Sequence, residues 1–214
     1  MIDRKSLIIK LNRVILIDGF QKLSMGKLAA AVNVSRASLY LYFKNKDDVV
    51  QAVVARHLKF MAEHPVPKHF TTTSFLPIWL DSLLLMGLTT TTFMTDLQKA
   101  YPVLYQEFIA ADQAYFEDLK AYVAAGQQAD FILDVFSADY VLFQAQALVR
   151  TVLDQVRAGQ LSLNQAEDYL AATLHLQLAG LLTPNSQAKL DVQQVVGFEQ
   201  TVLKEFREAY ALIS

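Results

Sequence analysis

Hydrophobic residues recur along this chain at spacings of three and four, which is the period of an amphipathic α-helix. The first run ends at Gly19, because glycine can adopt the left-handed backbone conformation that often ends a helix, which costs other residues energy. This run consists of Leu7, Ile8, Leu11, Val14 and Ile15. No asparagine-glycine or aspartate-glycine turn separates alternating strands downstream. The pattern therefore predicts an all-α protein.

Capping residues divide the helical pattern into ten predicted helices. Ser24 and Ser35 precede the second and third helices, where a hydroxyl oxygen can accept from a free backbone N–H. Asp47 and Asp48 open the fourth helix, since carboxylates favour the positive end of the helix dipole. The predicted ranges are 7–18, 25–31, 36–42, 47–62, 75–87, 89–99, 102–125, 130–158, 164–182 and 187–212.

Composition and charge narrow the class of protein. The 214 residues are 53% hydrophobic and 19% charged, which excludes disorder over most of the chain. There is no cysteine, which excludes disulfides, thiolate metal sites and cysteine nucleophiles. Residues 1–60 hold 11 basic and 4 acidic residues, a net charge of +7, whereas residues 61–214 hold 8 and 17, a net charge of −9. A basic head on an acidic body suggests that the head contacts a polyanion.

The most apolar segment is not a membrane span. Phe75 to Leu88 is too short to cross a bilayer, and it contains Pro77 and Asp81. The first apolar stretch is interrupted by charged residues, and no small-residue cleavage site follows it. We therefore expect a soluble, cytoplasmic protein with no membrane partner.

Two short predicted helices, 25–31 and 36–42, form a helix-turn-helix pattern. Asn33 lies in the tight turn between them, at a position that needs a positive φ, which asparagine tolerates. Leu28, Ala29 and Leu39 supply apolar contacts between the two helices. Such a pair can place the N-terminal end of its second helix in a major groove about 12 Å wide. Arg36 lies at that end.

Hydroxyl and ammonium groups surround this pair, and they are the usual donors to phosphate oxygens. Tyr40 and Tyr42 lie two positions apart, so they point to different faces and at least one faces solvent. The alternative is that the pair is only a packing unit. The predicted DNA-binding residues are Ser24, Lys27, Ser35, Arg36, Ala37, Ser38, Tyr40, Tyr42, Lys44 and Lys46.

The segment around this pair resembles the DNA-binding head of the tetracycline-repressor (TetR) family over about residues 7–56. The residues that carry the resemblance are Gly19-Phe20, Ser24, Leu28-Ala29, the run from Val34 to Phe43, and Lys46-Asp47-Asp48-Val49. It departs from the family pattern in two places. Asn33 replaces the usual turn glycine, and Lys10 and Asn12 occupy positions that are usually apolar or small.

The resemblance implies a homodimeric transcription regulator, most often a repressor, that binds a palindromic operator in double-stranded DNA. It implies an N-terminal three-helix head with a helix-turn-helix, followed by a larger helical ligand-binding and dimerisation domain. The expected division is a DNA-binding domain at 1–46, a connecting helix at 47–62 and the second domain at 63–214. The proline-rich segment 64–69 marks the main boundary.

The body is rich in aromatic residues, which can line an apolar cavity between helices or simply fill a core. Ten of the 23 aromatic residues fall within 101–143. The resemblance implies that the body binds a small-molecule effector, and the aromatic residues lead us to expect an apolar or aromatic one of unknown identity. The candidate pocket residues are Trp79, Met86, Phe93, Met94, Tyr105, Phe108, Tyr115, Phe116, Phe136, Tyr140 and Phe143.

The predicted helix 164–182 has apolar residues on more than one side, so it needs cover from its own domain and from a partner. The end of helix 130–158 offers a second apolar stripe. Two helices from each chain would then form a symmetric four-helix bundle, although burial of both within one protomer remains an alternative. The candidate interface residues are Leu148, Val152, Val156, Tyr169, Leu170, Thr173, Leu174, Gln177 and Leu181.

Catalytic chemistry has little support in the sequence. The chain has four histidines, but it has no HExxH motif and no glycine-rich phosphate loop. We expect no catalytic residue, metal or cofactor. The competing hypothesis is an all-helical ligand-binding protein or enzyme in which the helix pair is only structural.

Overall fold

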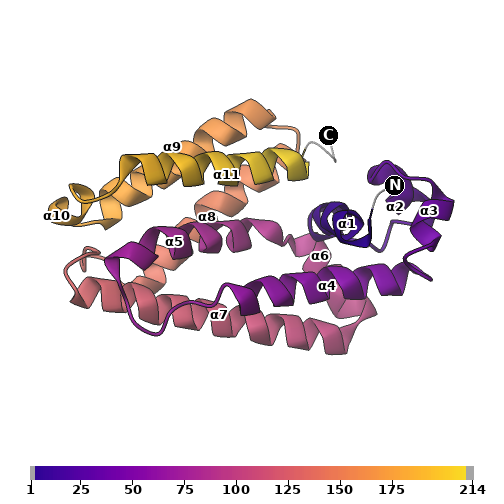
Figure 1. Cartoon of the computed structure of the whole chain (residues 1–214), viewed down its shortest axis with the longest axis horizontal. Helices are drawn as coiled ribbons and strands as arrows, with labels where there is room; N and C mark the ends of the chain where they lie inside the picture. Colours follow the sequence, from indigo (N-terminus) through magenta and orange to yellow (C-terminus); the bar gives the residue numbers. More distant parts are fainter. Residues whose placement is uncertain (1–2, 211–214) are drawn as a thin grey trace. The chain divides into compact units, whose positions relative to one another are not determined.

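The computed structural model describes residues 3–210, and within that range it contains eleven α-helices and no β-strand (Figure 1). The predicted all-α fold is confirmed. The helices are α1 Arg4–Asp18, α2 Met25–Ala31, α3 Arg36–Tyr40, α4 Lys46–Glu63, α5 Thr72–Leu88, α6 Thr91–Ala100, α7 Pro102–Gln128, α8 Ala138–Arg157, α9 Leu163–Leu181, α10 Pro184–Gln187 and α11 Val192–Tyr210.

The chain divides into two compact units. Of the described residues, unit 1 comprises 3–64, 88–113 and 208–210, and unit 2 comprises 65–87 and 114–207. The chain leaves unit 1 at His64, inside the proline-rich segment. Helix α6 and the first half of α7 also belong to unit 1, which the hydrophobic pattern did not indicate. The functional division at 1–46, 47–62 and 63–214 stays a prediction.

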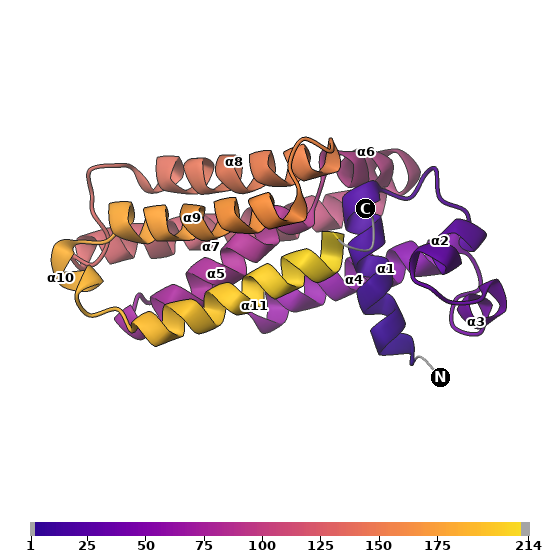
Figure 2. The same cartoon turned by 90° about the horizontal axis from the view of Figure 1, so that it is seen from above.

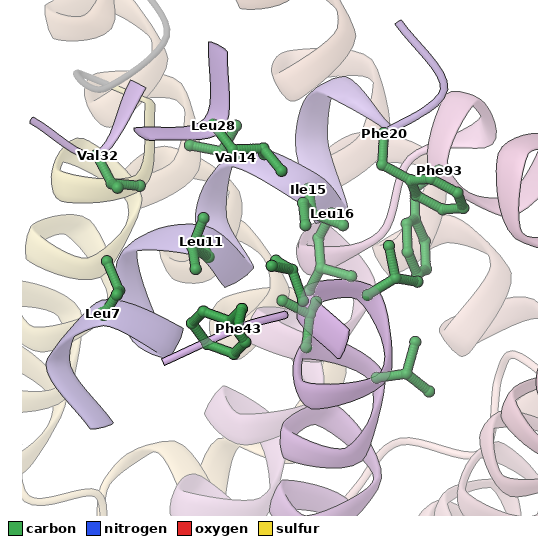
Figure 3. Packing of buried hydrophobic residues seen from close by; sticks show 14 of the residues in the cluster. Leu7, Leu11, Val14, Ile15, Leu16, Phe20, Leu28, Val32, Phe43 and Phe93 are labelled. Atoms are coloured by element: carbon green, nitrogen blue, oxygen red, sulfur yellow. The ribbon is translucent and has the colours of Figure 1, made fainter. Parts of the chain in front are cut away.

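The core of unit 1 is built around α1, which packs against α2, α4 and α6. Leu7, Leu11 and Ile15 lie on one face of α1 and are fully buried, as the spacing of apolar residues predicts. Figure 3 shows Phe43 close to this face and Phe20 beside Phe93 of α6. The Phe20 and Phe93 rings meet edge to face, with centroids 6.3 Å apart. This core supports the helix pair α2 and α3.

The caps of the head helices lie where the sequence predicts them. The Ser24 hydroxyl accepts from Lys27 N at 3.2 Å, and the Ser35 hydroxyl accepts from Ser38 N at 3.0 Å. Asn33 adopts φ of +57° in the turn between α2 and α3, as expected. Helix α3 is shorter than predicted, because it ends at Tyr40 and not at 42.

In unit 2, α8 and α9 pack side by side (Figure 2). The prediction of one helix over 130–158 is wrong at its start, since α8 begins at Ala138. The preceding segment bonds to distant backbone instead: Leu133 N donates to Leu181 O at 2.7 Å, and Ile132 forms an isolated bridge with Leu182. Backbone hydrogen bonds to residues distant in the sequence therefore take the place of helical ones in this segment.

The C-terminal prediction of a single helix over 187–212 is also corrected. A short helix, α10, is capped by the Thr183 hydroxyl and starts with Pro184, whose missing N–H is no loss at a first helical position. Helix α11 then runs from Val192 to Tyr210, and the end of the predicted range, 211–212, lies outside the described residues.

Within the described part of the chain, no single helix is long and apolar enough to cross a membrane. The bent pair Thr72–Gly87 and Thr91–Ala100 meets the length and composition criteria only when taken together.

Candidate DNA-binding surface

The second helix of the pair, α3, presents a polar surface and buries one side chain. Leu39 is fully buried against the head core, whereas Ser35, Arg36 and Ala37 at its N-terminal end are exposed. The Ser35 hydroxyl is 2.8 Å from the Ser38 hydroxyl, so both groups lie beside the free N–H groups of the first turn. The geometry leaves the N-terminal end of α3 open to a ligand with acceptor atoms.

Arg36 and Tyr40 lie one helical turn apart and form a pair on the outer face of α3. The guanidinium carbon is 5.4 Å from the centroid of the Tyr40 ring, and Arg36 Nη2 donates to the Tyr40 hydroxyl at 3.4 Å. This contact restricts the rotamers of a long exposed side chain. It orders Arg36 without burying its charge, which suits bidentate contact with a base or a phosphate.

Most of the predicted DNA-binding residues are exposed on this surface. Tyr40 is 42% exposed, whereas Tyr42 is half-buried and packs against the unit 1 core. The expectation that at least one of the two tyrosines faces solvent is therefore confirmed. The exposed members of the set are Ser24, Lys27, Ser35, Arg36, Ala37, Tyr40 and Lys44, and the half-buried ones are Ser38, Tyr42 and Lys46.

Lys46 is placed differently from a free surface lysine. Its ammonium donates to Phe20 O at 3.1 Å and to Gln21 O at 3.4 Å. These carbonyls follow the end of α1, so Lys46 joins the start of α4 to the turn before α2. The Lys46 ammonium would have to weaken these two hydrogen bonds to make the predicted contact with DNA.

Helix α6 binds the turn at Phe20 and Gln21 through the N–H groups of these two residues. The Asp96 carboxylate is buried, and its Oδ2 accepts from Phe20 N at 2.8 Å and from Gln21 N at 2.9 Å. Thr90, the N-cap of α6, donates its hydroxyl proton toward Leu16 O at 3.1 Å and Ile17 O at 2.9 Å. Thr90 and Asp96 therefore bind the last carbonyl groups of α1 and the backbone N–H groups that follow it.

A further contact joins the start of α4 to the start of α7 within unit 1. The Tyr101 hydroxyl donates to the Asp47 carboxylate, and its ring lies 5.6 Å from that of Phe20. Burial raises the pKa of Tyr101, and the neighbouring Asp47 charge raises it further. Tyr101 therefore stays a neutral donor throughout the physiological range of pH.

The predicted pocket residues fall in both units, and the pocket itself stays a prediction. Phe93 and Phe108 are fully buried in the unit 1 core, where their rings meet edge to face. Met94 and Tyr105 pack against that core, whereas Trp79, Met86 and Tyr115 are buried in unit 2 and Phe116 is half-buried there. Three predicted members are exposed: Phe136, Tyr140 and Phe143.

The predicted dimer residues differ in their exposure within one chain, and their place in an interface stays a prediction. Five of them are already covered by unit 2 itself, because they lie on the inner faces of α8 and α9: Val152, Thr173, Leu174, Gln177 and Leu181. Leu148, Val156 and Leu170 are half-buried, and only Tyr169 is exposed. The apolar side that α9 leaves uncovered is instead formed by Tyr169, Ala172, Leu176 and Ala179.

Asp96 and Thr90 are the positioning residues that sequence reasoning missed. Each lies more than 70 positions from the groups it binds, so no local spacing could indicate the contact. The Arg36–Tyr40 pair could have been found, since residues four apart on a helix are neighbours. Among the described residues, no group of three or more His, Asp or Glu side chains is placed to hold a metal ion.

Helices α1, α2 and α3 share an apolar core, and α2 and α3 have the arrangement of the helix-turn-helix motif of DNA-binding proteins. Residues 12–53 match the family described as bacterial regulatory proteins, tetR family. No curated protein matches the chain.

Solved structures share the fold over most of the chain. A TetR-family regulator from Marinobacter aquaeolei VT8 has 15% identity and a TM-score of 0.58, covering 94% of this chain and 99% of its own. The ketosteroid regulator KstR2 of Mycobacterium tuberculosis has 13% identity and a TM-score of 0.60, covering 86% and 97%. CprB from Streptomyces coelicolor, studied in complex with its operator, has 15% identity and a TM-score of 0.52, covering 94% and 96%.

The head of this chain is thus similar in sequence to TetR-family transcriptional regulators, and the chain shares its fold with solved members of that family. Both similarities are to transcriptional regulators, which favours the regulator hypothesis over the enzyme alternative.

Proposed function

We propose that this chain is a cytoplasmic, homodimeric repressor that binds a palindromic operator through α3 and is released from it by a small molecule. The observation that carries the proposal is the open N-terminal end of α3. Arg36 is exposed there and ordered by Tyr40, on a head whose first 60 residues have a net charge of +7. A duplex supplies the negative charge and the groove that such a surface fits.

Contacts on this surface divide by chemistry. Arg36 has the fork of donors that suits the O6 and N7 atoms of guanine, so we assign it to base recognition. The exposed hydroxyl and ammonium groups of Ser24, Lys27 and Lys44 suit phosphate oxygens, which position the head without reading sequence. Tyr40 serves both purposes, because its ring holds Arg36 and its hydroxyl faces solvent.

A second copy of the chain is the partner proposed for the uncovered side of α9. Leu176 is 64% exposed and Tyr169 is 51% exposed, with small residues between and beyond them. Large exposed apolar side chains in a row are costly in water, whereas a symmetric partner buries them on both chains. Phe143, on the neighbouring α8, is 67% exposed and adds to the same kind of surface.

The release mechanism is a shift of population between two dimer states. Two heads read one palindrome only when their α3 helices stand roughly 34 Å apart, one turn of the duplex. A ligand that binds more tightly to a state with another spacing weakens DNA binding by the ratio of its two affinities. Buried aromatic residues in unit 2, among them Phe75, Trp79 and Tyr115, support a binding region for an apolar effector.

Mobility shift with DNA flanking the protein's own gene tests the proposal. Arg36→Ala is expected to weaken binding by about 1–3 kcal/mol, or to relax sequence choice, since it removes a base-reading donor pair. Lys59→Ala is the matched control. It removes the same charge from unit 1, at an exposed site on α4 where Lys59 pairs with Glu63.

Salt dependence gives the second measurement. The logarithm of the binding constant should fall against the logarithm of salt concentration with a slope near −0.9 for each phosphate contacted. Unchanged affinity and selectivity in Arg36→Ala would show that α3 is not the reading helix. A flat salt slope would remove the electrostatic basis of the proposal.

A further inference from the structure

Gln177 has a buried hydrogen-bond donor without a protein acceptor. It lies on the inner face of α9 in unit 2, and only 3% of its surface is exposed. Its Oε1 accepts from Trp79 Nε1 on α5 at 3.3 Å. Because an indole N–H can only donate, this bond fixes which end of the amide is the oxygen. The other end, Nε2, has no hydrogen-bond partner among the described residues.

The buried hydroxyl groups of Thr173 on α9 and Ser82 on α5 are both satisfied within their own helices. The Thr173 hydroxyl donates to Tyr169 O at 2.7 Å, and the Ser82 hydroxyl donates to Ile78 O at 2.6 Å. Gln177 Nε2 is thus the one orphaned buried side-chain nitrogen or oxygen that the described part of unit 2 contains. Leaving a buried donor unpaired is unfavourable, so an acceptor delivered to this atom would bind with a gain.

The surroundings of the amide are aromatic. Trp79 stacks on Phe75 with ring centroids 6.0 Å apart, and Phe75 meets Phe131 edge to face at 5.3 Å. None of the described buried side chains is a lysine or an arginine. A carboxylate would therefore enter without a neutralising partner, at a high cost of desolvation, whereas a neutral carbonyl would not.

Helix α5 has a weak point beside this site. Pro77 lies inside the helix, two residues before Trp79. Proline has no backbone N–H and its ring crowds the preceding turn, so one helical hydrogen bond of α5 is missing there. This turn is therefore the part of α5 best able to adjust when a ligand ring packs on Trp79.

We propose that Gln177 is the specificity-determining contact for the effector, and that the effector is a neutral, ring-containing molecule with a carbonyl group. Its carbonyl oxygen accepts from Gln177 Nε2, and its apolar ring packs on Trp79 between α5 and α9. The inference rests on the ligand-responsive function proposed above.

Trp79 is the only tryptophan of the chain, so its fluorescence reports binding at this site directly. The probes are 4-phenylcyclohexanone and phenylcyclohexane, which have similar shapes and differ in the carbonyl. The ketone is expected to bind the full-length protein about 10-fold more tightly than the hydrocarbon, as one hydrogen bond to a buried donor allows. In Gln177→Met this preference should fall to within about 2-fold.

Thr173→Val is the matched control, one turn earlier on the same face of α9. Its hydroxyl is already satisfied by Tyr169 O, so the preference for the ketone should be unchanged. A second measurement needs no variant: the infrared carbonyl stretch of the ketone bound to the wild-type protein should lie at lower frequency than in hexane. This readout holds even if Gln177→Met fails to fold.

Four results would overturn the inference: equal binding of the two probes, binding of neither, a preference that survives in Gln177→Met, or an unshifted carbonyl stretch. Mobility shift without any probe keeps the two proposals separate. A protein that binds operator DNA but not the ketone overturns only the role of Gln177. A protein that binds the ketone through Gln177 but no DNA overturns only the regulator function.

Discussion

At the scale of single residues, Gly19 shows how one position can have two separate reasons for being glycine. It ends α1 with φ of +74° and ψ of −170°, a region that residues with a Cβ atom avoid. A Cβ atom there would also collide with the Asp96 carboxylate. The first reason follows from the helix stop in the sequence, and the second exists only in the folded chain.

Gly19→Ala is therefore expected to lower the free energy of unfolding by roughly 3 kcal/mol. Gly197→Ala is the control. Gly197 lies inside α11 with open space around its Cα, so alanine there should raise stability by up to about 1 kcal/mol. Chemical denaturation measures both, and equal effects of the two changes would contradict the account of Gly19.

His57 makes the stability of unit 1 depend on pH. It is buried on α4 and stacks on Phe108 at 4.7 Å, and its Nε2 has no partner among the described residues. Burial lowers the pKa of His57 to about 4, from an ordinary value of 6.5. The unfolded chain therefore binds a proton at higher pH than the folded chain does.

The stabilising effect of a neutral His57 is complete above pH 6.5 and is lost as the pH falls toward 4. At pH 5 the loss is about 2 kcal/mol relative to pH 7. His57→Phe keeps an aromatic ring against Phe108 but cannot titrate. Denaturation at several pH values should thus show a flatter profile for the variant over pH 4–6.5, and parallel profiles would rule out His57 as the source.

At the scale of elements, α6 fixes the end of α1 and through it the start of the helix pair. Asp96 accepts two backbone N–H groups with one oxygen, while Thr90 donates to two carbonyls of the same turn. Both residues lie in unit 1, so this contact is part of the head's own packing. The DNA-binding helices therefore depend on a segment about 75 residues further along the chain.

Asp96→Ala is expected to lower the free energy of unfolding by about 3 kcal/mol, because two amide groups lose their acceptor in a buried place. Asp96→Asn keeps an acceptor oxygen at the same position, so its effect should be about 1 kcal/mol. Thermal melts followed by circular dichroism distinguish the two. Equal losses would mean that the charge of Asp96, and not its geometry, holds the turn.

Helix ends were predictable where a cap is local and unpredictable where the partner is distant. Ser24 and Ser35 cap the helices that follow them, three residues from the N–H groups they accept. The start of α8 could not be placed, because residues 131–133 pair with Gly126 and with backbone near Leu182. Such pairing satisfies the same backbone groups as a helix would, so periodicity alone cannot exclude it.

At the scale of the whole molecule, the proposed dimer depends on the uncovered side of α9. Leu176→Glu is expected to raise the dimer dissociation constant by roughly 100-fold or more, since symmetry places two charges in one apolar interface. Sedimentation velocity measures the change. Val103→Glu, at an exposed apolar residue of α7 in unit 1, is the control and should leave association unchanged. A dimer that tolerates Leu176→Glu would place the interface elsewhere.

The division of roles between sequence and tertiary structure follows from the range of the interactions. Helical period, caps, the turn at Asn33 and the basic head are local properties, so the all-α fold and the exposed α3 surface were determined by the sequence alone. Tertiary packing alone decided which side of α9 faces inward. It also decided that the Gln177 amide nitrogen is left without a partner and that Asp96 binds the backbone of Phe20. A helix with apolar residues all round has no preferred inner face until its neighbours are in place.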